Sequence, residues 1–148
     1  MTNDFEIKAI ESFRAGLNCA QTVLGAYAEE LNIDKDMAIS VSCGFGAGMG
    51  RLQGTCGAVT GSYMVLGLYN CKKTTDNAVR KAGTYAMVQQ FSEKFIEANG
   101  STDCISLLKC DIKTDEAQQK AKEEHLFEMV CEKCITDSIA IINQMIGK

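Results

Sequence analysis

The sequence predicts an all-α protein, a single-domain bundle of six or seven helices with a glycine-rich loop before a central buried helix. Three observations predict this fold class. Apolar residues recur at three- and four-residue steps over much of the chain, proline is absent from all 148 residues, and glycines gather in one stretch. No linker or internal repeat divides the chain, so we expect one domain over residues 1–148, long enough to bury its own core.

The first part of the chain carries the pattern of three helices. Apolar positions at helical spacing predict a helix over residues 5–15, and Gly16 follows as its stop. Asn18 is the expected N-cap of a second helix over residues 19–31. After a break, a third, short helix is expected over residues 37–42.

The glycine-rich stretch over residues 44–61 reads GFGAGMGRLQGTCGAVTG and holds seven of the 13 glycines. Because glycine loses much backbone entropy on folding, such a run indicates positive φ or the close approach of another group. The stretch contains no G-x-G-x-x-G and is not followed by G-K-[ST]. We therefore expect no nucleotide to bind there.

The apolar segment over residues 58–68 predicts the central buried helix. Its small residues lie on one stripe, where another helix is expected to pack closely. A strand over residues 63–69 is the alternative, which the glycines weaken.

The rest of the chain predicts four helical segments. The first is long, has Thr74 or Thr75 as its cap, carries a broad apolar stripe and stops at Gly100. The second is a short turn with Cys104, the third is a solvated polar helix or connector, and the fourth is rich in isoleucine. Their expected ranges are residues 76–99, 101–109, 111–124 and 126–146.

Cysteine is the unusual component of the composition. The chain has one histidine and eight cysteines, which are Cys19, Cys43, Cys56, Cys71, Cys104, Cys110, Cys131 and Cys134. In a helical chain without a loop-rich disulfide pattern, this density favours intracellular metal binding or redox chemistry. Taken singly, Cys43, Cys71 and Cys110 are explained about equally well as small buried hydrophobes and as functional thiols.

The remaining composition excludes several classes of protein. A net charge of −4 and a pI near 5.0 argue against nucleic-acid binding. No apolar run approaches the roughly 20 residues that span a bilayer, and the first residues lack the pattern of a secretory signal. We therefore expect a cytoplasmic protein that does not insert into a membrane. His125, the single imidazole, falls in the polar connector, which disfavours a cysteine–histidine nucleophile pair.

Two cysteines are expected at helix starts, where the helix dipole lowers the pKa of a thiol. Cys19 begins the second helix, and Cys56 stands where the glycine-rich stretch enters the central helix. Cys131 and Cys134 form a C-x-x-C inside the last helix, which suits a metal more than a thioredoxin-like turn. From the residues alone, zinc, copper(I) and iron–sulfur clusters stay open.

The ordered set of motifs resembles a known family. The CGAVTG over residues 56–61 resembles the CGAxxG motif of the redox-active protein family C_GCAxxG_C_C, which is named for this motif and four cysteines. The NCAQ over residues 18–21 resembles its helix start, and the GFGAGMGR over residues 44–51 its glycine-rich lead-in. Cys104 and Cys131 are similar to the third and fourth cysteines.

The resemblance covers nearly the whole chain and implies a small, mainly helical prokaryotic protein that is redox-active. Such proteins are often associated with oxidoreductase or transporter functions. The chain is similar also to the cluster-bearing part of split-Soret cytochromes, which implies an iron–sulfur cluster. It lacks C-x-x-C-H, so no haem is expected. The chain departs from the family pattern by four additional cysteines, Cys43, Cys71, Cys110 and Cys134.

The leading hypothesis is a redox protein in which four cysteines converge on one site and bind an iron–sulfur cluster for electron transfer. These are Cys19, Cys56, Cys104 and Cys131, with Cys134 as an alternative ligand beside Cys131. The second hypothesis is a thiol–disulfide oxidoreductase with Cys56 as its catalytic nucleophile, and the third is a thiolate protein that handles zinc or copper(I). A redox partner protein is expected; the oligomeric state is not predicted, and a homodimer is one alternative.

Overall fold

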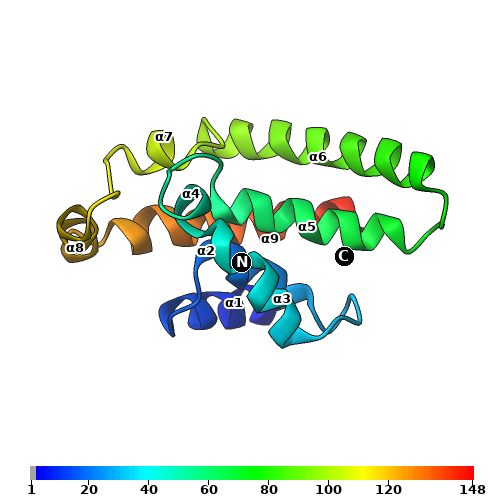
Figure 1. Ribbon diagram of the computed structural model, residues 1–148, viewed down its shortest axis with the longest axis horizontal. Helices are drawn as coiled ribbons and strands as arrows, with labels where there is room; N and C mark the ends of the chain where they lie inside the picture. The colour runs from blue at the N-terminus through cyan, green and yellow to red at the C-terminus, as the bar shows by residue number, and fades with distance from the viewer. Residues whose placement is uncertain (1–2) are drawn as a thin grey trace.

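The computed structural model describes residues 3–148, and helices with their connecting turns make up this part of the chain (Figure 1). Seven helices have seven or more residues: α1 (Asp4–Arg14), α2 (Cys19–Tyr27), α3 (Lys35–Ser42), α5 (Gly57–Cys71), α6 (Asn77–Asn99), α8 (Asp115–Glu123) and α9 (Glu132–Met145). The shorter segments are α4 (Gly46–Met49), α7 (Cys104–Leu108), a 3₁₀ turn (Cys43–Phe45) and a π-helical turn (Phe127–Cys131). The all-α prediction is confirmed. None of the described helices combines the length and the apolar character needed to cross a membrane.

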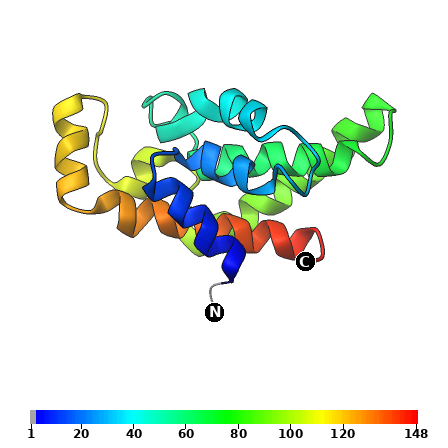
Figure 2. The same ribbon diagram turned by 90° about the horizontal axis from the view of Figure 1, so that it is seen from below.

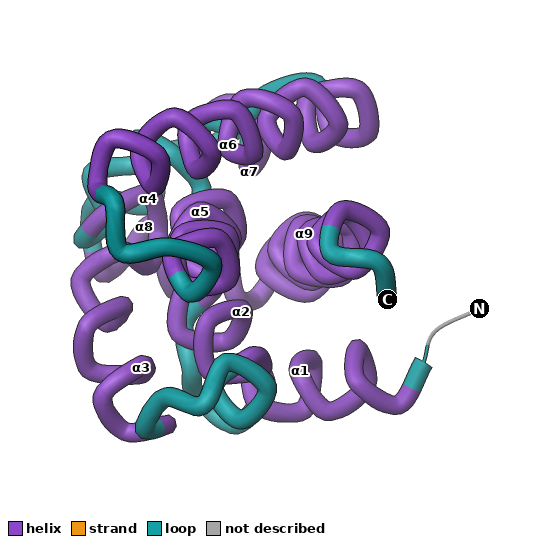
Figure 3. Tube along the Cα trace, turned by 90° about the vertical axis from the view of Figure 1, so that its right-hand side faces the viewer, coloured by secondary structure: helices purple, strands orange, loops and turns teal. Residues whose placement is uncertain are grey.

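The helices form three layers, which Figure 3 shows end-on. α6 covers one side, α5 and α9 lie side by side in the middle, and α1, α2 and α3 cover the other side. α8 stands at one end of the molecule, where it connects α7 to the last helix (Figure 2). The beginning of α5 and the chain leading into α9 therefore lie toward the same end as α7 and α8 (Figure 1).

The main core surrounds the middle layer. α9 buries Ile135, Ile139 and Ile142 completely, so its isoleucines follow the helical spacing expected from the sequence. From α6, the stacked rings of Phe91 and Phe95 join the same core, with 5.9 Å between their centroids. Each such side chain contributes about 1.5–3 kcal/mol when it leaves water.

α2 begins at the predicted N-cap. The Asn18 side chain accepts a hydrogen bond from the Gln21 backbone N–H at 2.9 Å, and the Gln21 side chain accepts one from the Asn18 N–H at 3.0 Å. This reciprocal capping box satisfies two N–H groups that the helix itself leaves unpaired. It also fixes Cys19 as the first residue of α2. The helix ends at Tyr27, earlier than expected.

α2 and α5 approach each other closely because α5 presents glycine to its neighbour. A Cβ on Gly61 would lie 2.9 Å from the Ala20 carbonyl oxygen and 3.2 Å from its Cα. A Cβ on Gly57 would lie 3.0 Å from the Ala20 backbone nitrogen. The prediction that small residues on this stripe let another helix pack closely is confirmed.

The alternative of a strand over residues 63–69 is wrong, because α5 runs without interruption from Gly57 to Cys71. Tyrosine, valine and methionine in this segment also suit a strand. Tertiary packing decides the matter, since the buried residues recur at helical steps against two neighbouring helices.

One expectation for α6 is also wrong. Its N-cap is Asp76, whose carboxylate accepts hydrogen bonds from the N–H groups of Ala78 and Val79, whereas Thr74 or Thr75 was expected. The broad apolar stripe is not buried along its length, since 60% of Tyr85 is exposed. α6 forms an outer layer alone, so its neighbours cover only a narrow seam along it.

The tight contact between α2 and α5 makes a testable prediction. Gly61→Ala should lower the free energy of unfolding by about 1–3 kcal/mol, because the new methyl group overlaps Ala20. Gly67→Ala is the matched control in the same helix, since its Cβ would meet only the Thr84 methyl group at 3.8 Å. The control should be neutral or more stable by up to about 1 kcal/mol. Urea denaturation measures both, and equal effects of the two substitutions would contradict close packing at Gly61.

Candidate functional site

A cavity of about 560 Å³ opens at the end of the molecule where α2 and α5 begin. Its size falls within the range of about 300–1,000 Å³ that is typical of ligand sites. Five of the eight cysteines line it: Cys19, Cys56, Cys104, Cys131 and Cys134. The structure therefore brings the four predicted site cysteines together around one space, and their role there stays a prediction.

Cys19 and Cys56 reach the cavity from two neighbouring helix starts. Cys19 is the first residue of α2, and Cys56 is the N-cap of α5. Gly57 allows this arrangement, because a Cβ at that position would lie 3.1 Å from the Cβ of Cys19. The first glycine of the CGAVTG motif, Gly57, thus lets Cys19 lie close to the start of α5.

Cys104 is held beside Cys56 by two backbone hydrogen bonds. The Cys56 N–H donates to the Thr102 carbonyl oxygen at 2.7 Å, and the Cys104 N–H donates to the Gly54 carbonyl oxygen at 2.7 Å. These bonds flank an isolated antiparallel bridge between Thr55 and Asp103. The segment that leads into α5 and the segment that leads into α7 are therefore fixed side by side.

Cys131 and Cys134 enter the cavity from the chain that begins α9. Cys131 ends the π-helical turn and is half-buried, whereas only 2% of Cys134 is exposed. π-Helical turns are rare and often occur at functional sites. Both cysteines of the C-x-x-C face the same cavity, as a helical arrangement predicts.

The cavity thiols differ in how readily they ionise. A hydrogen bond from the Cys134 thiol lowers the pKa of Cys56, and the backbone N–H groups of Ala58 and Val59 act in the same direction against the effect of burial. These amides belong to the first turn of α5, where the positive end of the helix dipole stabilises an anion. The expectation of a lowered pKa at a helix start therefore holds for Cys56, whereas it is wrong for Cys19, because the neighbouring Cys131 thiol and burial raise the pKa of Cys19.

The other thiols favour their protonated forms. The pKa of Cys134 is raised by its hydrogen bond to Cys56 and by burial. The pKa of Cys19 is raised first by a hydrogen bond with Cys131 and then by burial. Burial raises the pKa of Cys104 to about 12, and the nearby sulfurs of Cys56 and Cys19 add to the shift.

Three cysteines do not line the cavity. Cys43 is exposed in the 3₁₀ turn, so it is not a small buried hydrophobe. Cys71 is half-buried at the far end of α5. Cys110 is half-buried after α7 and packs against a small second core cluster that includes Cys104 and Ile112.

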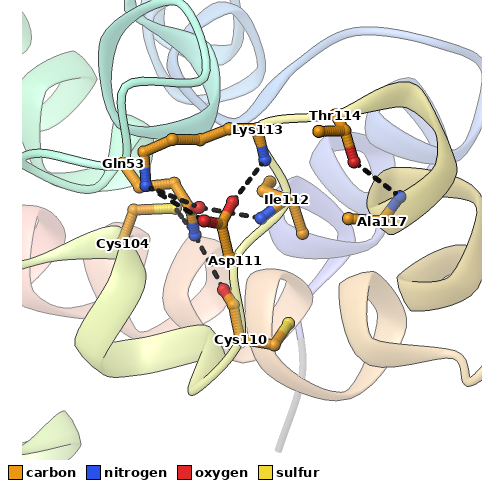
Figure 4. A network of polar contacts seen from close by, with 8 residues as sticks. All are labelled: Gln53, Cys104, Cys110, Asp111, Ile112, Lys113, Thr114 and Ala117. Atoms are coloured by element: carbon orange, nitrogen blue, oxygen red, sulfur yellow. Dashed lines mark hydrogen bonds and ion pairs between the residues drawn. The ribbon is translucent and has the colours of Figure 1, made fainter.

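Gln53 organises one wall of the site and was not expected from the sequence (Figure 4). Its Nε2 donates to the Cys110 carbonyl oxygen at 2.9 Å, and its Oε1 accepts from the Ile112 N–H at 2.8 Å. The same Nε2 lies 4.0 Å from the Cys104 sulfur. Gln53 is buried and has a φ of 57°, so the glycine-rich stretch turns here to direct this side chain inward. The sequence contains no local signal for this role, since the partners lie far along the chain.

Apolar and charged side chains complete the cavity. Phe13, Leu107 and Phe127 are among the apolar residues of its wall. At its edge, the Arg14 guanidinium binds both carboxylate oxygens of Glu132 at 2.8 and 2.9 Å. Within residues 3–148, no three histidine, cysteine, aspartate or glutamate side chains gather around the position of a single metal ion.

Comparison with known proteins places the chain in a family. The profile of the family described as "Putative redox-active protein (C_GCAxxG_C_C)" matches residues 17–145. The chain belongs to this C_GCAxxG_C_C family. An uncharacterised protein of Archaeoglobus fulgidus is 33% identical over 105 residues, which cover 66% of this chain and 69% of the relative. No solved structure matches.

The family match spans every cysteine that lines the cavity. It supports redox activity as the broad role of this C_GCAxxG_C_C protein. The description names no cofactor and no substrate, so the chemistry has to be argued from the cavity itself.

The contacts of Gln53 make a testable prediction. Gln53→Ala should lower the free energy of unfolding by about 1–3 kcal/mol, because the buried Ile112 N–H loses its acceptor. Hydrogen exchange at the Ile112 amide should accelerate in the same variant. Gln119→Ala is the control, since Gln119 is exposed on α8, and it should change stability by less than about 0.5 kcal/mol. An Ile112 amide that stays protected in Gln53→Ala would contradict this role.

Proposed function

We propose that the cysteine-lined cavity is a redox site that binds an iron–sulfur cluster and transfers electrons to or from a partner protein. The ligands would be Cys19, Cys56, Cys104 and Cys131, with Cys134 as the alternative to Cys131. When bound, such a cluster supplies one-electron transfer through its irons, and the protein sets its potential.

One observation carries this proposal. Four cysteines that lie far apart in the sequence line the same cavity, and each comes from a separate segment of the fold. Iron–sulfur clusters of the [2Fe–2S] and [4Fe–4S] types are bound by four cysteine thiolates. The redox-active description of the family agrees with a role of this kind.

The chemistry of the cavity fits a cluster in three respects. The volume of about 560 Å³ suits a multi-atom group. The backbone N–H groups of Ala58 and Val59, in the first turn of α5, contribute to lowering the pKa of Cys56, and donors near ligand sulfurs tune a metal site. Apolar walls around Phe13 and Leu107 limit water near the thiols, which also affects potential.

Binding would change the protonation of the site. Cys19 and Cys104 hold their protons in the metal-free protein, since burial contributes to raising the pKa of both thiols. Metal ligands are thiolates, so uptake releases these protons and becomes more favourable as the pH rises. Cys56 is the thiol best prepared to bind first, because its anion is already stabilised.

A thiol–disulfide oxidoreductase is the second candidate. The specific observation in its favour is the lowered pKa of Cys56 together with the thiol of Cys134 beside it. A stabilised thiolate next to a second thiol is the arrangement that thiol exchange requires.

The iron–sulfur proposal predicts iron and acid-labile sulfide in protein purified without oxygen. Serine in place of Cys19, Cys56 or Cys104 should reduce bound iron by about tenfold or more, since even outer-shell changes reduce metal affinity by about 10–100-fold. Cys43→Ser and Cys71→Ser are the matched controls and should retain wild-type iron, because neither residue lines the cavity. Folded wild-type protein that lacks iron, or that retains zinc or copper instead, would contradict the proposal.

A further inference from the structure

We propose that a second pocket, at the turn between α5 and α6, binds a small oxyanion with two negative charges, such as inorganic phosphate. The pocket has a volume of about 460 Å³, within the range that is typical of ligand sites. Three cationic side chains line it: Lys72, Lys73 and Arg80. This site goes beyond the proposed redox function and does not depend on it.

The pocket is separate from the cysteine-lined cavity. Cys56 is the N-cap of α5, whereas Cys71 and Lys72 lie at the other end of this helix. Because α5 has 15 residues and a helix rises about 1.5 Å per residue, the two sites are roughly 20 Å apart. Figure 1 shows the turn between α5 and α6 at the end of the molecule remote from α8. A small ligand in this pocket therefore lies out of contact with the cavity thiols.

The charge of the pocket is opposite to the charge of the whole protein. The chain has a net charge of −4. Among the described residues that line the pocket, three are cationic and none is acidic. Within residues 3–148, no carboxylate forms an ion pair with Lys72, Lys73 or Arg80. Since cations held close together repel one another, a bound anion would stabilise this arrangement.

The two lysines of the pocket are held in place by contacts with the protein. The Lys72 ammonium donates a hydrogen bond to the Leu31 carbonyl oxygen. The Lys73 ammonium lies 4.7 Å from the centre of the Tyr69 ring, where cation–π attraction acts on it. Side chains that are already ordered lose less entropy when a ligand binds, so these contacts favour binding.

Arg80 connects the turn to the first part of α6. Its Nε donates to the Thr74 carbonyl oxygen at 2.7 Å. Its own carbonyl oxygen accepts from Asn70 Nδ2 at 3.3 Å, and the same Nδ2 lies 3.1 Å from Thr84 Oγ1. These bonds join the end of α5 to α6 beside the pocket. The outer N–H groups of the guanidinium have the fork geometry that matches two oxygens of a phosphate.

Hydroxyl groups add hydrogen-bond donors to these charges. Thr74 Oγ1 accepts from the Asp76 N–H at 3.1 Å, so the hydroxyl proton can be donated to a ligand. Thr75 lines the pocket as well. The nearby Asp76 carboxylate does not line the pocket, because it accepts from the N–H groups of Ala78 and Val79 at the start of α6. Three cations with hydroxyl donors suit a dianion better than a monoanion such as acetate.

An NMR titration of the ¹⁵N-labelled full chain tests the proposal. Inorganic phosphate is added at about pH 8, where it is mostly a dianion. Sodium acetate and sodium chloride are titrated in parallel at equal ionic strength, so that general screening is the same. We expect saturable shifts of the Thr74 and Thr75 amide signals with phosphate, weaker binding of acetate and no saturation with chloride. The readout lies far from the cysteines, so its failure is distinct from failure of cluster binding.

Three variants locate the binding site. Arg80→Gln should weaken phosphate binding by about fivefold or more, because it removes the forked donor. Lys73→Gln, at an exposed position, should weaken binding in the same direction and serves as the test if Arg80→Gln does not fold. Lys81→Gln is the matched control, since it removes the same charge from the next residue of α6, outside the pocket, and should change binding by less than about twofold.

Three results would overturn the proposal. One is a set of amide shifts that chloride reproduces, and another is acetate binding as tight as that of phosphate. The third is a loss of affinity in Lys81→Gln that equals the loss in Arg80→Gln, because general charge rather than this pocket would then explain the binding.

Discussion

The close contact between α2 and α5 is the constraint on which the rest of the structure depends. Gly57 and Gly61 bring the backbone of α5 against Ala20, and a methyl group at either glycine would overlap that residue or its neighbours. Because the two helices begin side by side, Cys19 and Cys56 stand at adjacent helix starts. The packing that stabilises the middle of the molecule thereby also builds the site.

The same arrangement creates differences among otherwise identical thiols. The pKa of Cys56 is lowered by the neighbouring Cys134 thiol and by the backbone N–H groups in the first turn of α5. Cys104 has no comparable set of donors, and burial raises its pKa to about 12. Thiols of unequal acidity around one cavity suit redox chemistry, because one sulfur is ready to bind or react while its neighbours stay protonated.

Local features were predictable from the sequence, and long-range ones were not. The Asn18 cap and the glycine stop at Gly100 depend on residues within a few positions, so their patterns can be read directly. Gln53 has partners about 60 positions away, and no periodicity indicates them. The exposure of part of α6 could not be predicted for a related reason. An apolar stripe does not indicate how many neighbouring helices will cover it. The family motif identified Cys19, Cys56, Cys104 and Cys131, and the C-x-x-C pattern marked Cys134 as the alternative ligand; that all five line one cavity is a long-range result of the fold.

The central claim is that thiols from separate segments meet in one cavity to form a redox site. Diffraction at the iron absorption edge from crystals of anaerobically purified protein tests it most directly. The account predicts anomalous density for iron inside the cavity, bonded to the sulfurs of Cys19, Cys56 and Cys104 and to one cysteine of the C-x-x-C. Iron bound only at a surface thiol such as Cys43, or a cavity without iron in anaerobic crystals, would contradict it.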